Sequence, residues 1–182
     1  FIPHFFDFSN KISDFDKNHD IGISGHLGFE PYPMRTRIYH YLERWHNNRY
    51  NISVLPHPGY SQKSFSHNIV GEKYIQYLST NWLNITCRGG WRNGMVGKYV
   101  EIGKSLSLPI GDVPYSLNKK CKELMVAIDN EDDNSELDYK ISSALSNKSE
   151  LKERIKEYQN ECEKSYDFRV LVPEMLSVIR DL

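Results

Sequence analysis

The sequence predicts an α/β fold in which a parallel sheet lies between layers of helices. Short apolar runs alternate with longer segments of helical periodicity over residues 20–130, and this order is typical of a parallel sheet. The apolar runs carry few polar residues, as expected for strands that are buried on both faces. The last third of the sequence shows only helical patterns, so we expect a helical segment to end the domain.

The composition indicates an ordinary globular protein of one domain. The chain has 182 residues, 39% of them hydrophobic and 26% charged, and its net charge is −1. This near-neutral charge argues against a nucleic-acid partner, and no apolar run is long enough to span a membrane. The three cysteines follow neither a disulfide pattern nor a metal-site spacing, which favours a reducing, cytoplasmic location.

Five apolar segments are predicted to be strands. They are DIGISG (20–25), YNISVLPHPG (50–59), WLNITC (82–87), LSLPIGD (106–112) and ELMVAIDN (123–130). The first run ends at a glycine and the second is closed by proline and glycine, which are residues that end strands.

Three helices are predicted between the strands and three more after them. The first three are RTRIYHYLERW (35–45), GEKYIQYLS (71–79) and MVGKYVEIGKSL (95–106). The last three are NSELDYKISSALSN (134–147), NKSELKERIKEYQNECEK (147–164) and VPEMLSVIRDL (172–182). Ser135 and Asn147 are each followed three residues later by an acid, a typical helix start. The acidic run 129–136 is predicted to be a solvated loop.

Three loops follow the first three predicted strands. In parallel α/β sheets, ligands bind at the carboxyl ends of the strands, which selects SGHLGFEPYPMR (24–35), HPGYSQKSFSHN (57–68) and CRGGWRNG (87–94). The third loop has three glycines but matches neither the dinucleotide nor the P-loop pattern. This loop therefore fits either a backbone that approaches an anion closely or a plain tight turn.

The order of these segments resembles a known family. DIGISG, YPMRTRIYHYL, GEKYIQYLSTNWLNITC and GKYVEIGKSLSLPIGD, followed by terminal helices, are similar to the C-terminal lobe of GT-B glycosyltransferases of the group 1 type. The resemblance implies a Rossmann-like, donor-binding domain over residues 19–182. Residues 1–18 resemble the linker between the two lobes, with Pro3 and His4 followed by an acid. The chain also lacks an initiator methionine, so we expect a fragment whose N-terminal acceptor lobe is missing or separate.

The resemblance gives catalytic and binding roles to four residues. It implies that Glu101 accepts hydrogen bonds from the ribose hydroxyls and that Gly25 lets the backbone approach the ligand. It implies that Arg35 and Lys98 neutralise the departing diphosphate. The alternatives are a surface ion pair between Lys98 and Glu101 and an ordinary surface arginine at position 35.

Five further positions belong to the same implied site. His26 stands near a position where the family often has arginine, which predicts a differently built phosphate site. Arg88 and Trp91 lie in the loop that meets the base, although Trp91 also fits a core-capping role. Tyr99 is assigned to the nucleotide site as part of the K-Y-x-E-I pattern. Asn93 replaces the first of two acids found in many retaining members, so the stereochemical course stays open.

The implied function is transfer of a sugar from a nucleoside-diphosphate sugar, UDP- or GDP-linked, to a glycan or protein acceptor in carbohydrate biosynthesis. No cofactor and no metal are expected, because cationic side chains stabilise the leaving group. The acceptor lobe would complete the enzyme, so this chain alone is expected to be incomplete for turnover. A sugar-nucleotide epimerase of the same architecture and a non-catalytic α/β interaction module are the alternatives. The sequence does not specify the base, sugar or acceptor.

Overall fold

The described residues form a sheet of five parallel strands. The computed structural model describes residues 6–27, 32–45, 49–56, 69–88 and 94–180. The strands are β1 (His19–Gly25), β2 (Ile52–Pro56), β3 (Asn81–Ile85), β4 (Leu108–Gly111) and β5 (Val126–Ala127), in the order β2-β1-β3-β4-β5. The chain places β2 on one side of β1 and then crosses over to place β3 on the other side of β1.

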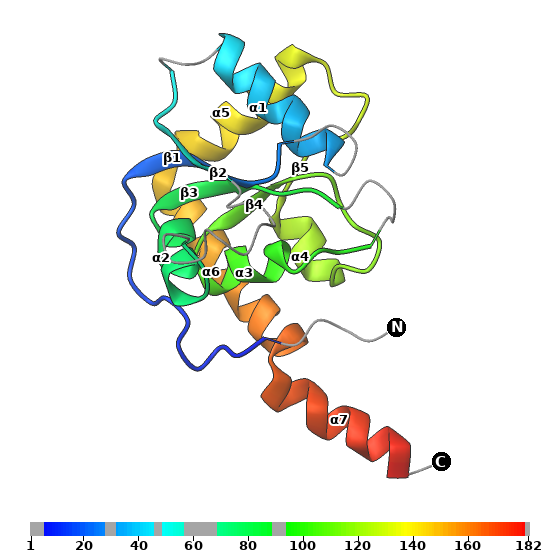
Figure 1. Cartoon of the computed structure of the whole chain (residues 1–182). Helices are drawn as coiled ribbons and strands as arrows, with labels where there is room; N and C mark the ends of the chain where they lie inside the picture. The colour runs from blue at the N-terminus through cyan, green and yellow to red at the C-terminus, as the bar shows by residue number, and fades with distance from the viewer. Residues whose placement is uncertain (1–5, 28–31, 46–48, 57–68, 89–93, 181–182) are drawn as a thin grey trace, which may run out of the picture.

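Seven helices accompany the sheet in the described part of the chain. Four alternate with the strands: α1 (Pro33–Trp45), α2 (Glu72–Ser79), α3 (Lys98–Lys104) and α4 (Lys119–Leu124). Three follow the last strand: α5 (Asn134–Ser146), α6 (Lys148–Tyr166) and α7 (Phe168–Arg180). Figure 1 shows α1 and α5 on one face of the sheet, α2, α3, α4 and α6 on the other, and α7 extending away from the body. This is the three-layer α/β arrangement predicted from the sequence.

The middle of the sheet is buried on both faces. Ile21 and Ile23 of β1 pair in register with Leu83 and Ile85 of β3, and all four side chains are at most 1% exposed. Gly22 lies between them and leaves space for polar side chains from β3. This burial on both faces explains why the strands appear as almost unbroken apolar runs in the sequence.

A second glycine brings the ends of β3 and β4 into close contact. Gly111 has φ 154°, and a Cβ atom added there would stand 1.9 Å from the backbone oxygen of Thr86. The amide of Thr86 donates to the carbonyl of Ile110 at 3.0 Å. Only a residue without a side chain fits at position 111. The close contact places Asp112, which follows β4, beside the residues that follow β3.

The helix starts and the acidic run differ partly from the prediction. Asn147 caps α6 as predicted, accepting from the amides of Ser149 and Glu150. The first residue of α5 is Asn134, and its cap is Asp133 rather than Ser135, because the Asp133 carboxylate accepts from the amide of Glu136. Within the acidic run most residues are exposed, but Asp132 is 7% exposed and pairs with Lys140 at 2.6 Å.

Two other predicted boundaries were wrong. The short helix α4 falls in a segment for which no helix was predicted, and α7 begins at Phe168, before the expected Val172. Pro173 is the sixth residue of α7 and therefore lies inside the helix. The helix begins before the proline: the Asp167 carboxylate accepts from the Arg169 amide at its start, and the Phe168 amide donates to the Phe6 carbonyl.

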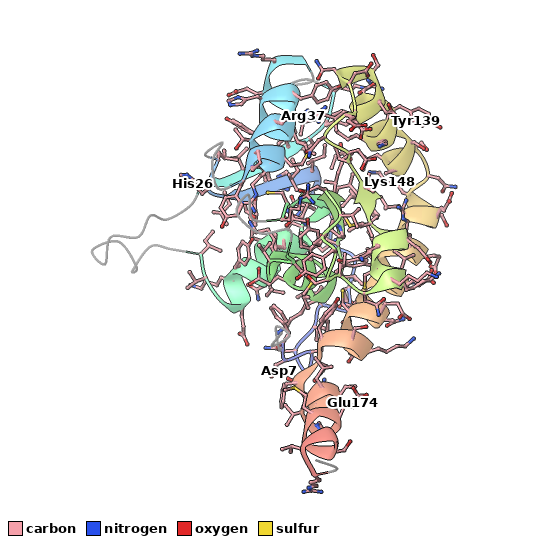
Figure 2. The ribbon with its side chains drawn as sticks, turned by 90° about the vertical axis from the view of Figure 1, so that its right-hand side faces the viewer. Asp7, His26, Arg37, Tyr139, Lys148 and Glu174 are labelled. Atoms are coloured by element: carbon pink, nitrogen blue, oxygen red, sulfur yellow. The ribbon has the colours of Figure 1, made fainter. Side chains whose placement is uncertain are left out.

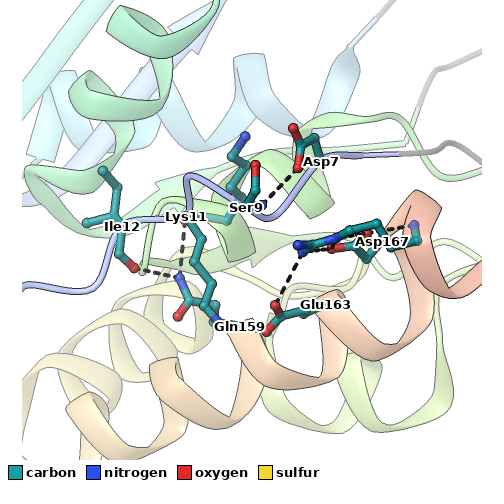
Figure 3. Close-up of polar contacts among 9 residues, drawn as sticks. Asp7, Ser9, Lys11, Ile12, Gln159, Glu163 and Asp167 are labelled. Atoms are coloured by element: carbon teal, nitrogen blue, oxygen red, sulfur yellow. Dashed lines mark hydrogen bonds and ion pairs between the residues drawn. The ribbon is translucent and has the colours of Figure 1, made fainter.

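The segment before β1 packs against the last helices. The Phe6 amide donates to the Tyr166 carbonyl and the Phe168 amide donates to the Phe6 carbonyl, both at 3.0 Å. Figure 3 shows the polar contacts around this junction, including the bond from the Gln159 side chain to the Ile12 carbonyl and the ion pair of Lys11 with Glu163. Residues far apart in the sequence thus lie side by side at the base of α7.

Candidate functional site

The topology selects one edge of the sheet for a ligand. The strand order reverses between β1 and β3, and in such sheets ligands bind beyond the carboxyl ends of the strands at this switch point. Gly25 ends β1, and Thr86, Cys87 and Arg88 follow β3. The loops selected from the sequence at positions 24–35 and 87–94 therefore meet here in their described parts, while the loop 57–68 lies outside the described residues.

Gly25 provides a backbone surface at which two cationic side chains meet. Its φ is 95°, and a Cβ atom built there would lie 2.9 Å from Arg35 Nη1 and 3.0 Å from Lys98 Nζ. Arg35 comes from α1 and Lys98 from the first turn of α3. The structure thus brings together three residues that the sequence analysis had placed in one site.

Arg35 is an almost fully buried cation. The residue is 3% exposed, its Nη1 donates to the His26 carbonyl at 3.3 Å, and its Cζ lies 4.3 Å from the centre of the Tyr32 ring. Its Nε has no hydrogen-bond partner, and no carboxylate among the described residues forms an ion pair with it. Burying a charge is costly without a partner. The site is therefore suited to an anionic ligand.

The side chain of Lys98 reaches Gly25 from α3. Its Nζ donates to the Ser24 carbonyl at 2.6 Å and to Ser24 Oγ at 3.2 Å, and it lies 5.8 Å from the centre of the Tyr74 ring. Burial, together with the nearby Arg35 charge, lowers the pKa of Lys98 to about 7, and the charge of Glu101 opposes this shift. The Arg35 and Lys98 charges therefore repel each other, and an anion between them would relieve that repulsion.

We expect diphosphate affinity to fall as the pH rises above 7. An ammonium of pKa about 7 loses its proton in this range, whereas a terminal phosphate with pKa near 6 is already ionised. The affinity for UDP should decrease between pH 7 and 9 by up to about tenfold per unit. Isothermal titration calorimetry at several pH values measures this slope.

The Lys98→Met variant is the control for this titration. It should bind UDP more weakly at pH 7 but show no pH slope between 7 and 9. A wild-type affinity that stays constant over this range would contradict a role for the Lys98 ammonium. The stability of the protein should rise with pH over the range in which UDP affinity falls. The pKa of Lys98 is lower in the folded protein than in the unfolded chain, so the contribution of Lys98 to the free energy of unfolding increases between pH 7 and 10.

Glu101 lies one turn after Lys98 on α3. It lines a cavity of about 500 Å³ that is also lined by Tyr74 of α2. Its charge raises the pKa of Lys98 and contributes to the high pKa of Tyr74, for which burial is the main cause. Glu101 therefore interacts electrostatically with Lys98, while its side chain borders the cavity of about 500 Å³.

A third cationic residue is held by a buried carboxylate. Asp112, 8% exposed, follows Gly111 and accepts from the Arg88 amide and from Arg88 Nε, both at 2.9 Å. Tyr99 is fully buried, and its hydroxyl donates to the Asp112 carbonyl at 2.6 Å. Burial raises the pKa of Asp112, and its contacts with Arg88 oppose that shift. Tyr99 thus supports the Arg88–Asp112 pair from within the core.

The remaining predicted site residues are placed as follows. His26 directly follows β1, and its carbonyl accepts from Arg35; Figure 2 shows it beside α1. Trp91 and Asn93 lie outside the described residues. The nucleotide-binding roles of His26, Trp91 and Tyr99 stay predictions.

Two residues with a clear place in the site, Tyr74 and Asp112, lie outside the predicted site, and a third, Ser24, was predicted only as part of the loop 24–35. Ser24 and Tyr74 share a hydrogen bond of 2.9 Å between their hydroxyls and surround the Lys98 ammonium, and Asp112 positions Arg88. Tyr74 lies in the predicted helix 71–79 and Asp112 ends the predicted strand 106–112, and neither was given a role in the site. Their positions after or beside strand ends were the only signal available.

The described residues form neither a metal-binding cluster nor a membrane-spanning helix. No group of three or more His, Cys, Asp and Glu side chains there has an arrangement that would hold a metal ion. Among the helices of the described ranges, none combines the length and apolarity needed to cross a bilayer.

Comparison with known proteins identifies the fold. No protein-family model and no curated protein sequence matches the chain. A solved structure described as an alpha-glucosyltransferase (AGT) in complex with UDP is similar to it, with a TM-score of 0.63 and 9% sequence identity. The similarity covers 97% of this chain and 53% of that one, so the chain spans about half the length of the glucosyltransferase. The predicted Rossmann-like α/β fold is confirmed, and it is a fold found in a glycosyltransferase.

Proposed function

We propose that this chain is the nucleotide-sugar-binding lobe of a glycosyltransferase of the two-lobed GT-B architecture. The observation that carries the proposal is the convergence of Arg35 and Lys98 on Gly25, at the switch point of the sheet, with Arg35 buried and without a carboxylate partner among the described residues. Such a site suits a diphosphate, which presents several oxygens to guanidinium and ammonium groups at once. The UDP bound in the structurally similar glucosyltransferase supports UDP as the first ligand to test.

The proposed chemistry is leaving-group stabilisation. When the bond between the sugar carbon and the β-phosphate oxygen breaks, negative charge develops on the β-phosphate. Arg35 and Lys98 would stabilise that charge in a partly dehydrated site, where such electrostatic effects are strong. Arg88, held by Asp112, lies at the end of the neighbouring strand and is proposed to contact the nucleotide beyond the diphosphate.

The acceptor is proposed to bind to another lobe. Residues 19–182 would form the donor domain and residues 1–18 the connection to an acceptor lobe, and the coverage of about half of the glucosyltransferase is in line with this division. Positioning the acceptor contributes several kcal/mol to catalysis, so we propose that the described domain binds the donor but needs a second lobe for efficient transfer to a glycan or protein.

The Glu101→Gln variant tests the proposed function. In wild-type protein we expect saturable binding of UDP by calorimetry, and in the variant a loss of about 1–3 kcal/mol in binding free energy, because an amide is a weaker acceptor for two ribose hydroxyls than a carboxylate. The variant should unfold at nearly the same temperature as wild type, since Glu101 is only half-buried.

A matched comparison uses deoxyuridine diphosphate. If Glu101 holds the ribose, removing the 2′-hydroxyl from the ligand should cost affinity in wild type but little in Glu101→Gln. Absence of UDP binding in wild type would contradict the proposed function itself, whereas normal UDP binding by a folded Glu101→Gln variant would remove only Glu101 from the site.

A further inference from the structure

Two buried cysteines meet between α4 and α6. The sulfur atoms of Cys121 on α4 and Cys162 on α6 lie 3.8 Å apart, and both residues are 0% exposed. The third cysteine, Cys87, is also buried and free, but it follows β3 on another part of the sheet. The fold thus brings together two thiols that stand 41 positions apart in the sequence, where their spacing indicates no pairing.

The two sulfur atoms are close enough to form a bond after a small rearrangement. The S–S bond of a disulfide is about 2.05 Å long, so the sulfurs of Cys121 and Cys162 need to approach each other by ~1.8 Å. Rotation about the Cα–Cβ bonds moves each sulfur while the backbone stays in place. The short helix α4 has only six residues, so a slight shift of α4 also brings the sulfurs closer.

Other contacts hold α4 against α6 on both sides of the cysteine pair. The amide of Asn118 donates to the Tyr166 hydroxyl at 2.7 Å, and Lys120 Nζ lies 3.1 Å from Glu157 Oε1. These contacts keep the backbones of the two helices in a fixed relative position. Groups held close together in this way react with each other much faster than with a reagent from solution. If either cysteine is oxidised, its first reaction partner is therefore the other cysteine.

The surroundings of the pair keep the thiols unreactive until an oxidant reaches them. Burial raises the pKa of the Cys162 thiol well above its ordinary value, so this thiol is protonated at neutral pH and is a poor nucleophile. Because both residues are fully buried, a bulky reagent cannot reach the sulfurs in the folded protein. A small oxidant such as hydrogen peroxide reaches them through local opening of the short α4.

We propose that Cys121 and Cys162 form a reversible redox site, in which a peroxide converts the two thiols into a disulfide that ties α4 to α6. One sulfur, as a thiolate, attacks a peroxide oxygen, the O–O bond breaks, and a sulfenic acid and a hydroxide form. The second sulfur then attacks the sulfenic sulfur, forms the S–S bond and displaces a second hydroxide. The two hydroxides take up the two thiol protons, so two thiols are oxidised while one hydrogen peroxide is reduced to two waters.

The proposed disulfide would stabilise the domain. It would close a loop over residues 121–162, which contain β5, α5 and most of α6. A cross-link of this kind restricts the unfolded chain more than the folded one and therefore raises stability. The inference is independent of the proposed function, because neither cysteine belongs to the cationic site.

The test compares wild type with Cys162→Ala and Cys87→Ala. Cys87→Ala is the matched control, because it also removes one fully buried sulfur but leaves the pair between α4 and α6 intact. Each protein is treated with hydrogen peroxide, the excess is removed with catalase, and the protein is unfolded in N-ethylmaleimide. Mass spectrometry counts the alkylated thiols, and peptide mapping identifies linked cysteines. Thermal unfolding is recorded before oxidation, after oxidation and after reduction with dithiothreitol.

Oxidised wild type should keep one free thiol of its three, and the map should link residue 121 to residue 162. Oxidised Cys87→Ala should contain the same link, and Cys162→Ala should contain none. The unfolding temperature of wild type and of Cys87→Ala should rise by about 5–10 °C on oxidation and return on reduction, whereas that of Cys162→Ala should not rise.

Several results would overturn the inference. These are three free thiols in peroxide-treated wild type, a disulfide that involves Cys87 or joins two molecules, and sulfinic or sulfonic acids in place of a link between Cys121 and Cys162. A link that forms without raising the unfolding temperature would overturn the stabilising role. If Cys162→Ala does not fold, Cys121→Ala replaces it, and the thiol count and peptide map of wild type decide the inference without any variant.

Discussion

Replacing Arg35 by methionine should lower the affinity for UDP about 100-fold and leave the affinity for uridine nearly unchanged. The guanidinium is the most buried cation of the site, and charge-assisted hydrogen bonds to phosphate contribute about 1.5–3 kcal/mol each. Methionine keeps much of the apolar length of the side chain, so the packing of α1 is preserved. Calorimetric titration with UDP and uridine measures both affinities.

Arg37→Met is the control on the same helix. The Arg37 guanidinium donates to the carbonyls of Asp129 and Asn130 at 3.1 Å each, away from Gly25, so its loss should lower stability without changing UDP affinity. Arg35→Met should instead unfold at an equal or higher temperature, because it removes a buried charge that has no acidic partner among the described residues. Equal losses for UDP and uridine in Arg35→Met would point to a folding defect and contradict the assignment.

Gly111→Ala should have the largest effect on stability. The new Cβ would stand 1.9 Å from the Thr86 backbone oxygen, and a φ of 154° is rarely adopted by residues with side chains. Backbone atoms of two neighbouring strands would have to separate, which we expect to cost about 3 kcal/mol or more of unfolding free energy. Urea denaturation followed by circular dichroism measures the change, and a complete loss of folded protein agrees with the same expectation.

Gly94→Ala provides the comparison for this substitution. A Cβ at Gly94 would have no heavy atom within 4 Å, so the variant should unfold within about 0.5 kcal/mol of wild type. If Gly111→Ala is as stable as Gly94→Ala, the close approach of β3 and β4 does not exist in solution. The contact of Arg88 with Asp112, which depends on that approach, would then also need revision.

Most of the fold could be predicted because the buried strands are apolar runs. Each predicted strand overlaps a real one, and Leu151, Ile155 and Tyr158, which recur at helical spacing in a predicted helix, are buried. The short α4 could not be predicted from periodicity, because its single face is formed by Cys121 and Leu124 alone. Its start is marked by Asn118, which accepts from the amides of Lys120 and Cys121.

The candidate site could be predicted only in part. Gly25, Arg35 and Lys98 were identified through a family resemblance, and no spacing in the sequence shows that residues ten and more than seventy positions apart meet at one glycine. Asp112 could not be recognised because its partner Arg88 lies on a different strand end. Side chains from separate loops become neighbours only through the strand order, and that order is a property of tertiary packing.

The junction between residues 6–12 and α6 also fixes an order of events during synthesis. Phe6 is hydrogen-bonded to Tyr166 and Phe168, and the Gln159 side chain donates to the Ile12 carbonyl, so these contacts cannot form until α6 has been translated. The same segment carries Phe8, whose side chain is 1% exposed in the folded protein. Residues 6–12 precede the whole sheet in the sequence but are therefore among the last to dock, because their partners close the longest loop of the described chain. On the ribosome, we expect residues 6–12 to remain accessible to chaperones throughout the growth of the sheet.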